Sequence, residues 1–133
     1  MNEFETIARY FKPLTEGRDA LLDDAAVLSV PPGFELVVTS DTLNAGTHFM
    51  ADAAAGDIAR KALRVNLSDL AAMGARPFAY QLNIAFPARP SEGWLAEFTS
   101  ALMDDQKTFG IFCSGGDTTT ILGAFSISIT AMG

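Results

Sequence analysis

Four aspartates occupy positions from which a carboxylate could bind a cation. Three of them border expected strands or follow a glycine pair, and one lies within an expected helix: Asp24, Asp41, Asp117 and Asp69. Mg²⁺ prefers oxygen ligands and bridges a few carboxylates to phosphate oxygens. The sequence has neither a Cys/His cluster for zinc nor a G-x-x-x-x-G-K-[ST] phosphate loop. The set therefore suits hard-cation chemistry, although the spacing alone does not single it out.

Three of these aspartates also have an ordinary explanation. The pair Asp23-Asp24 suits a solvated loop, and Asp41 suits a turn at the end of a strand. Asp117 follows Gly115-Gly116, which is common loop chemistry. Both interpretations stay open on the residues alone.

Asp69 is the hardest of the four to explain. On a helix from Asp57 to Met73 it falls, together with Asn66, within the arc that carries the apolar residues. A buried carboxylate without a partner is strongly destabilising. We therefore expect Asp69 to be paired, protonated or bound to a cation. The alternative is that Asn66 and Asp69 form hydrogen bonds to a loop.

The sequence contains one histidine and one cysteine. His48 lies in a segment of small residues, 44–55, and composition alone favours a surface position for it. Cys113 is expected to be a small apolar residue in a buried strand. A lone cysteine forms no internal disulfide, which suits the cytoplasm.

The pattern of apolar residues predicts how these side chains are positioned. Helices are expected over 3–11, 57–73 and 91–109, the last with Ser91 as its N-cap. Strands are expected over 26–30, 35–41, 79–86, 111–114 and 125–130. This order predicts an α+β fold, in which helices pack on one face of a mixed, largely antiparallel sheet.

Length and composition exclude several classes of protein. A chain of 133 residues with 49% hydrophobic and 19% charged residues is expected to form one globular domain. Sixteen acidic and nine basic residues give a net charge of −7, which disfavours binding to nucleic acid. The apolar runs are too short for a membrane span, and the acidic N-terminus does not resemble a signal peptide. We expect a cytoplasmic protein.

Several motifs occur in an order that carries a family resemblance. They are EFETIARYF, DDAAVL, VVTSDTLNAGTHF, ARKALRVNLSDLAAMGARP and GGDTT. Together they closely resemble the N-terminal domain of the thiamine-monophosphate kinase family. That family belongs to the aminoimidazole ribonucleotide synthetase-like superfamily, and the resemblance covers nearly the whole chain. It implies an N-terminal ATP- and Mg²⁺-binding domain over 1–133, a C-terminal domain outside this sequence, and an isolated fragment without activity.

The family implies a reaction and a set of site residues. The reaction is ATP-dependent phosphorylation of thiamine monophosphate to thiamine diphosphate by direct transfer, with several Mg²⁺ ions. Matched to the motifs, the metal ligands are Asp24, Ser40, Asp41, Asp69 and Asp117. We expect the four aspartates to share one open cleft, with Asn66 holding the Asp69 carboxylate in place. Thr39, Gly116 and Asp117 correspond to nucleotide positions, and Phe109 stands near an aromatic position of the nucleotide site. His48 corresponds to a residue that contacts the substrate, which reverses the inference from composition.

The chain departs from the family pattern at two places. Leu22 stands where a glycine often precedes the aspartate pair, and Thr119 and Thr120 stand where an arginine often follows GGDT. Family members form homodimers through the sheets of their N-terminal domains, and we expect the same here. Two other functions are alternatives: an ATP-dependent synthetase of the same superfamily, and a dimerisation module without catalysis. The TSDT and THF segments argue against the first, and the intact aspartates argue against the second.

Overall fold

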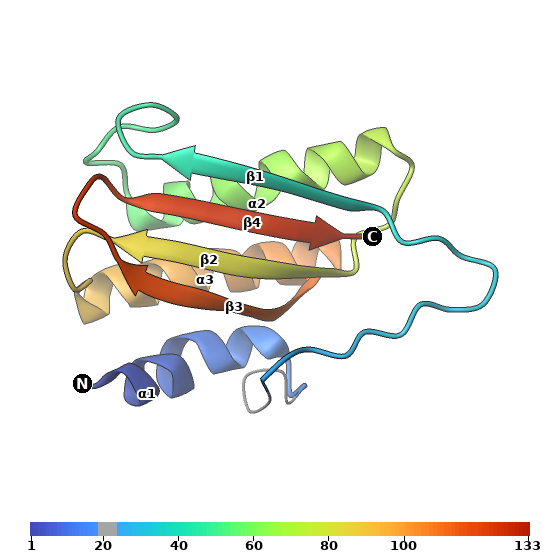
Figure 1. The fold of residues 1–133 in the computed structure, drawn as a ribbon, viewed down its shortest axis with the longest axis horizontal. Helices are drawn as coiled ribbons and strands as arrows, with labels where there is room; N and C mark the ends of the chain where they lie inside the picture. Colours follow the sequence, from blue (N-terminus) through green and yellow to red (C-terminus); the bar gives the residue numbers. More distant parts are fainter. Residues whose placement is uncertain (19–23) are drawn as a thin grey trace.

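The computed structural model describes residues 1–18 and 24–133, and within them a four-stranded sheet carries two long helices on one face (Figure 1). The strands are β1 (Val38–Asn44), β2 (Ala79–Phe86), β3 (Phe112–Thr120) and β4 (Ser126–Met132). They lie in the order β1-β4-β2-β3, so β1 and β3 form the two edges. β4 is antiparallel to both of its neighbours, whereas β2 and β3 are parallel. The predicted fold class is confirmed.

The helices α2 (Ala55–Ala72) and α3 (Glu92–Phe109) form the second layer. Ser91 begins α3 as predicted, because its hydroxyl accepts a hydrogen bond from the Trp94 backbone N–H at 3.0 Å. Gly110 ends the helix with φ of 71°, a left-handed conformation that glycine adopts without strain. Neither helix is long and apolar enough to cross a membrane, and this holds for every helix within the described ranges.

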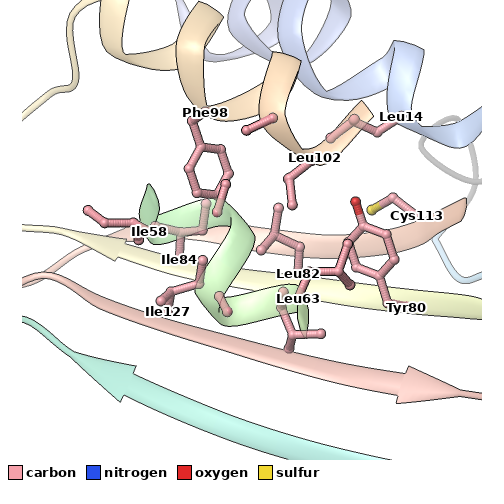
Figure 2. Close-up of a cluster of buried hydrophobic side chains, with 14 of the residues drawn as sticks. Leu14, Ile58, Leu63, Tyr80, Leu82, Ile84, Phe98, Leu102, Cys113 and Ile127 are labelled. Atoms are coloured by element: carbon pink, nitrogen blue, oxygen red, sulfur yellow. The ribbon is translucent and has the colours of Figure 1, made fainter. Parts of the chain in front are cut away.

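The strands place apolar side chains toward the helices and polar ones on the opposite face. Leu82 and Ile84 of β2 are buried, whereas Gln81 and Asn83 between them are exposed. Side chains from both helices and the sheet form the main core, part of which Figure 2 shows, and a smaller cluster of Ala79, Phe112 and Met132 lies apart from it. The largest fully buried members of the main core include Tyr80, Phe98, Leu63 and Leu102. Burial of such side chains is the main favourable term in folding.

The N-terminal helix is longer than the sequence predicts. It begins at α1 (Glu3–Thr6) and continues through the π-helical turn η1 (Ile7–Phe11) and the 3-10 turn η2 (Lys12–Thr15). Asn2 caps α1 through a capping box with Glu5. The segment lies beside the β3 edge of the sheet (Figure 1), so it extends the helical layer past the last strand.

Three predicted strands differ from the structure. The strand expected over 35–41 is displaced to β1, Val38–Asn44, so Asp41 lies within the strand and not at its end. The other two differ more. The first, 26–30, forms no strand; it belongs to an extended arm that projects beyond the sheet and turns at Pro32-Gly33 before β1. Val27 is 95% exposed there, because no neighbouring strand covers it. The second, 111–114, is too short, since β3 continues through the glycine pair to Thr120. A register shift between Tyr80 and Gln81 lets β3 stay paired with β2 across the glycines.

Candidate functional site

A pocket of about 510 Å³ lies between the N-terminal helix and the β3 edge of the sheet. Glu3, Ile7 and Phe11 form one wall, and residues 113–118 of β3 form the other. Asp24, where the described chain resumes, and Asp117 both line this pocket and are exposed to solvent. The structure therefore brings together two of the four predicted carboxylates, from segments that are far apart in the sequence.

The glycine pair fixes where Asp117 lies. Gly116 pairs with Leu82 and Asp117 pairs with Asn83 in the parallel ladder. Gly116 has φ of 150°, and a Cβ atom at this position would stand 1.8 Å from the Leu82 carbonyl oxygen. Only glycine fits this close approach of two backbones. The glycine thus keeps β3 against β2 and holds Asp117 opposite Asn83.

The other two predicted carboxylates lie at the opposite edge of the sheet. Thr39 and Asp41 of β1 alternate with exposed residues and share the face that carries buried Leu43. The Thr39 hydroxyl donates to the Asp69 carboxylate of α2 at 3.4 Å. Because β4 and β2 separate β1 from β3, the expectation that all four aspartates share one cleft is wrong for a single chain. Within the described ranges, no three His, Cys, Asp or Glu side chains gather as a metal site.

Asp69 is exposed, which corrects the expectation that it is buried. The helical arc to which it belongs passes over the β1 edge, so part of that arc faces solvent. Asn66 is instead the buried polar residue, with no exposed surface. Its amide nitrogen donates to the Ala62 carbonyl at 3.0 Å, and its side-chain oxygen has no partner. Asn66 therefore does not hold Asp69 in place.

The remaining predicted residues are dispersed over the fold. Ser40 lies on the open face of β1 opposite Thr130, and Phe109 is 40% exposed at the end of α3. His48 lies in the predicted irregular segment, where its Nδ1 accepts a hydrogen bond from the Asn44 backbone N–H at 2.8 Å. This bond leaves Nε2 of the neutral ring as the protonated nitrogen. Leu22 and Asp23 lie outside the described residues.

Sequence reasoning missed two polar members of the pocket wall. Gln81 and Asn83 line the pocket beside Asp117. The alternation of β2 had placed both on its polar face, but only the pairing of β2 with β3 brings them next to the glycine pair. Cys113 also lines the pocket, and burial raises the pKa of its thiol to about 11. It is therefore a protonated thiol at neutral pH.

The fold and the pocket define an α+β domain with carboxylates and amides beside a glycine-containing strand. The family model described as "AIR synthase related protein, N-terminal domain" matches residues 22–133. The chain belongs to this family.

Similar proteins are thiamine-monophosphate kinases. The chain is 45% identical over 134 residues to the enzyme of Caulobacter vibrioides, an alignment covering 98% of this chain and 38% of that protein. It is 40% identical over 137 residues to the enzyme of Haemophilus influenzae, covering 100% of this chain and 41% of the relative. The chain thus spans about two fifths of the length of these relatives.

Solved structures of such enzymes share the fold. The crystal structure of thiamine-monophosphate kinase from Stenotrophomonas maltophilia K279a matches with a TM-score of 0.79 and 42% identity, covering 96% of this chain and 41% of that one. The structure of AaThiL complexed with AMPPCP and TMP matches with a TM-score of 0.72 and 25% identity, covering 98% and 41%.

Proposed function

We propose that this chain contributes to ATP- and Mg²⁺-dependent phosphorylation of thiamine monophosphate to thiamine diphosphate. The supporting observation is a pocket with Asp24, Asp117 and the glycine pair, in a chain 45% identical to a thiamine-monophosphate kinase over 98% of its length. A relative that binds AMPPCP and TMP supports a nucleotide and a phosphorylated thiamine as ligands. In this proposal the domain supplies metal, phosphate and part of the substrate contacts, and a C-terminal domain completes the site.

The donor atoms of the pocket fit Mg²⁺. Asp24 and Asp117 offer carboxylate oxygens, and Gln81 and Asn83 offer amide oxygens, which are hard ligands. Mg²⁺ usually keeps several waters and joins one or two protein carboxylates to substrate phosphates, so two carboxylates suffice. When bound, the metal neutralises phosphate charge as the phosphoryl group is transferred.

The chain's own residues have the following proposed roles. Asp24 and Asp117 hold metal at the β3 edge, and Ser40, Asp41 and Asp69 hold metal at the β1 edge. Gly116 lies beside the nucleotide phosphates, while Thr39 and Phe109 contact the nucleotide. His48 contacts the substrate through Nε2–H, because Nδ1 is already bonded to the backbone. An apolar pocket of about 230 Å³, lined by Phe49, Trp94 and Phe125 among others, adjoins the His48 segment.

Binding of nucleotide to this chain tests the metal assignment. Asp24→Asn keeps the shape of the side chain but removes its charge, so we expect affinity for AMPPCP in Mg²⁺ to fall about tenfold or more. Asp104→Asn is the matched control, since Asp104 is exposed on α3 away from the pocket. Isothermal titration calorimetry should show the lower affinity of Asp24→Asn and an unchanged affinity of Asp104→Asn. Equal affinity of wild-type protein in Mg²⁺ and in EDTA would contradict the proposal.

The proposed homodimer joins the sheets of two copies. The open face of the sheet carries no helix, and the projecting arm exposes Val27 by 95% and Phe34 by 74%. Exposed apolar side chains of this kind mark interaction surfaces. Because β1 and β3 are opposite edges, stacking the open faces of two sheets about a two-fold axis parallel to the strands brings the β1 carboxylates of one copy toward the β3 carboxylates of its partner. Each composite site, formed between the two copies, then contains both pairs of carboxylates: Asp41 and Asp69 from one copy, and Asp24 and Asp117 from the other.

Mixing two inactive variants tests this arrangement in the full-length protein. Asp41→Asn and Asp117→Asn should each lose activity alone. After subunit exchange, half of the dimers hold one intact composite site, so activity should return to about a quarter of wild type. A mixture that stays inactive, although native mass spectrometry detects the heterodimer, would contradict sites shared between copies.

A further inference from the structure

Gln106 of α3 is the centre of a buried polar network outside the pocket. The Tyr80 hydroxyl donates to Oε1 of Gln106 at 2.8 Å. Nε2 of Gln106 donates to the Leu14 carbonyl and to the Glu16 carboxylate, both at 3.0 Å. Gln106 is 2% exposed and Tyr80 has no exposed surface. Since the amide oxygen accepts and both amide hydrogens donate, only one orientation of the amide satisfies the network.

The network holds the end of the N-terminal helical segment. Leu14 and Glu16 end this segment, and Figure 2 shows Leu14 and Cys113 on the same side of the core as Tyr80. Glu16 adopts φ of 53°, the single non-glycine residue with positive φ in the described part of the chain. Such a conformation costs free energy unless neighbouring contacts maintain it. The bond from Gln106 to the Glu16 carboxylate is such a contact.

The same segment is a wall of the pocket. Glu3, Ile7 and Phe11 face β3 across it, and the described chain returns to the pocket at Asp24. The other contacts of the segment are less directional. Tyr10, Phe11 and Leu14 are buried by non-directional apolar packing. The ion pair between Arg9 and Glu92 is exposed, and such pairs contribute little.

We propose that Gln106 is a positioning residue for the Asp24–Asp117 pocket. It fixes the N-terminal wall against β3 through Leu14 and Glu16, and the Tyr80 hydroxyl sets the orientation of its amide. The expected effect on nucleotide affinity rests on the proposed function, in which this pocket binds Mg²⁺ and a nucleotide. The positioning itself is a geometric property that can be measured without any ligand.

Cys113 provides a built-in reporter for the wall. It is the sole cysteine of the chain, is 4% exposed and lines the pocket. Its raised pKa adds to this protection, because the thiolate is the reactive form. The rate at which 5,5′-dithiobis(2-nitrobenzoic acid) modifies the native protein therefore reports how often the wall opens.

Gln106→Leu removes these three hydrogen bonds and a weaker contact of Nε2 with Met103 Sδ at 4.0 Å, and leaves the Tyr80 hydroxyl without its partner. We expect thiol modification to accelerate about tenfold, and affinity for AMPPCP in Mg²⁺ to fall about tenfold. Tyr80→Phe removes only the hydroxyl and should change both quantities in the same direction, by less. Thr99→Val is the control, because it deletes another buried hydrogen bond of α3, to the Leu95 carbonyl, that does not involve the N-terminal segment. It should leave both quantities at the wild-type value despite a lower melting temperature.

Three outcomes would overturn the proposal. In the first, thiol modification in folded Gln106→Leu and Tyr80→Phe proceeds at the wild-type rate. In the second, Thr99→Val accelerates it equally, which would show general destabilisation. In the third, modification accelerates but nucleotide affinity stays unchanged. If the wild-type protein binds no AMPPCP in Mg²⁺, that result contradicts the proposed function instead. The rates of Cys113 modification then still decide whether Gln106 fixes the N-terminal wall.

Discussion

Gly116→Ala should destabilise the domain by about 4 kcal/mol or more, the range of the most disruptive single substitutions. The new Cβ would stand 1.8 Å from the Leu82 carbonyl oxygen and 2.7 Å from its carbonyl carbon. Both atoms belong to the backbone of a central strand, so they cannot move aside as a flexible side chain would. The clash can be relieved only by separating β3 from β2, which also displaces Asp117.

Gly115→Ala is the matched control for this prediction. Gly115 has φ of 154°, but a Cβ there meets no atom within 4 Å. This variant carries backbone strain without the clash, and we expect a loss of about 1–3 kcal/mol. Urea denaturation followed by circular dichroism measures both variants. Equal stability of the two alanine variants would contradict the close approach of β3 and β2 at Gly116.

Asp117→Asn should reduce formation of thiamine diphosphate by the full-length protein about a hundredfold or more. Amide and carboxylate have the same shape, so the loss reflects the missing negative charge at the proposed metal. Removing one electrostatic contact to a reacting group commonly has an effect of this size. The rate of product formation at saturating ATP and thiamine monophosphate measures it.

Asp104→Asn again serves as the control, because it changes the same charge on an exposed part of α3. Its rate should equal that of the wild type. The melting temperature of Asp117→Asn should also stay near that of the wild type, since Asp117 is exposed. Full activity in Asp117→Asn would remove this residue from the proposed metal site.

Elements with a strong local pattern could be predicted from the sequence. The strict alternation of 79–86 predicted β2 at its observed bounds, and Ser91 predicted the start of α3. The segment 26–30 has the composition of a strand, but among residues 1–18 and 24–133 no partner strand pairs with it. The glycine pair concealed the length of β3, since glycines usually weaken a strand. Here Gly116 is needed because it packs against Leu82.

The location of the candidate site depended on topology, which local patterns do not contain. The insertion of β4 between β1 and β2 separates Asp41 from Asp117 by two strands. The position of Asp24 depends on how the N-terminal helix docks beside β3. The helical arc was a poor guide for Asp69, because α2 extends over the edge of the sheet and that side chain contacts Thr39 in solvent. Residue types thus indicated the chemistry, while long-range pairing determined which residues meet.

The most direct test of the proposed function is the reaction itself, carried out with the full-length protein. The protein is incubated with ATP, thiamine monophosphate and Mg²⁺, and ³¹P NMR follows the phosphorus resonances. We expect thiamine diphosphate and ADP to form in equal amounts, and both to be absent when EDTA replaces Mg²⁺. Hydrolysis of ATP without thiamine diphosphate, or equal formation of thiamine diphosphate in EDTA, would contradict an Mg²⁺-dependent kinase.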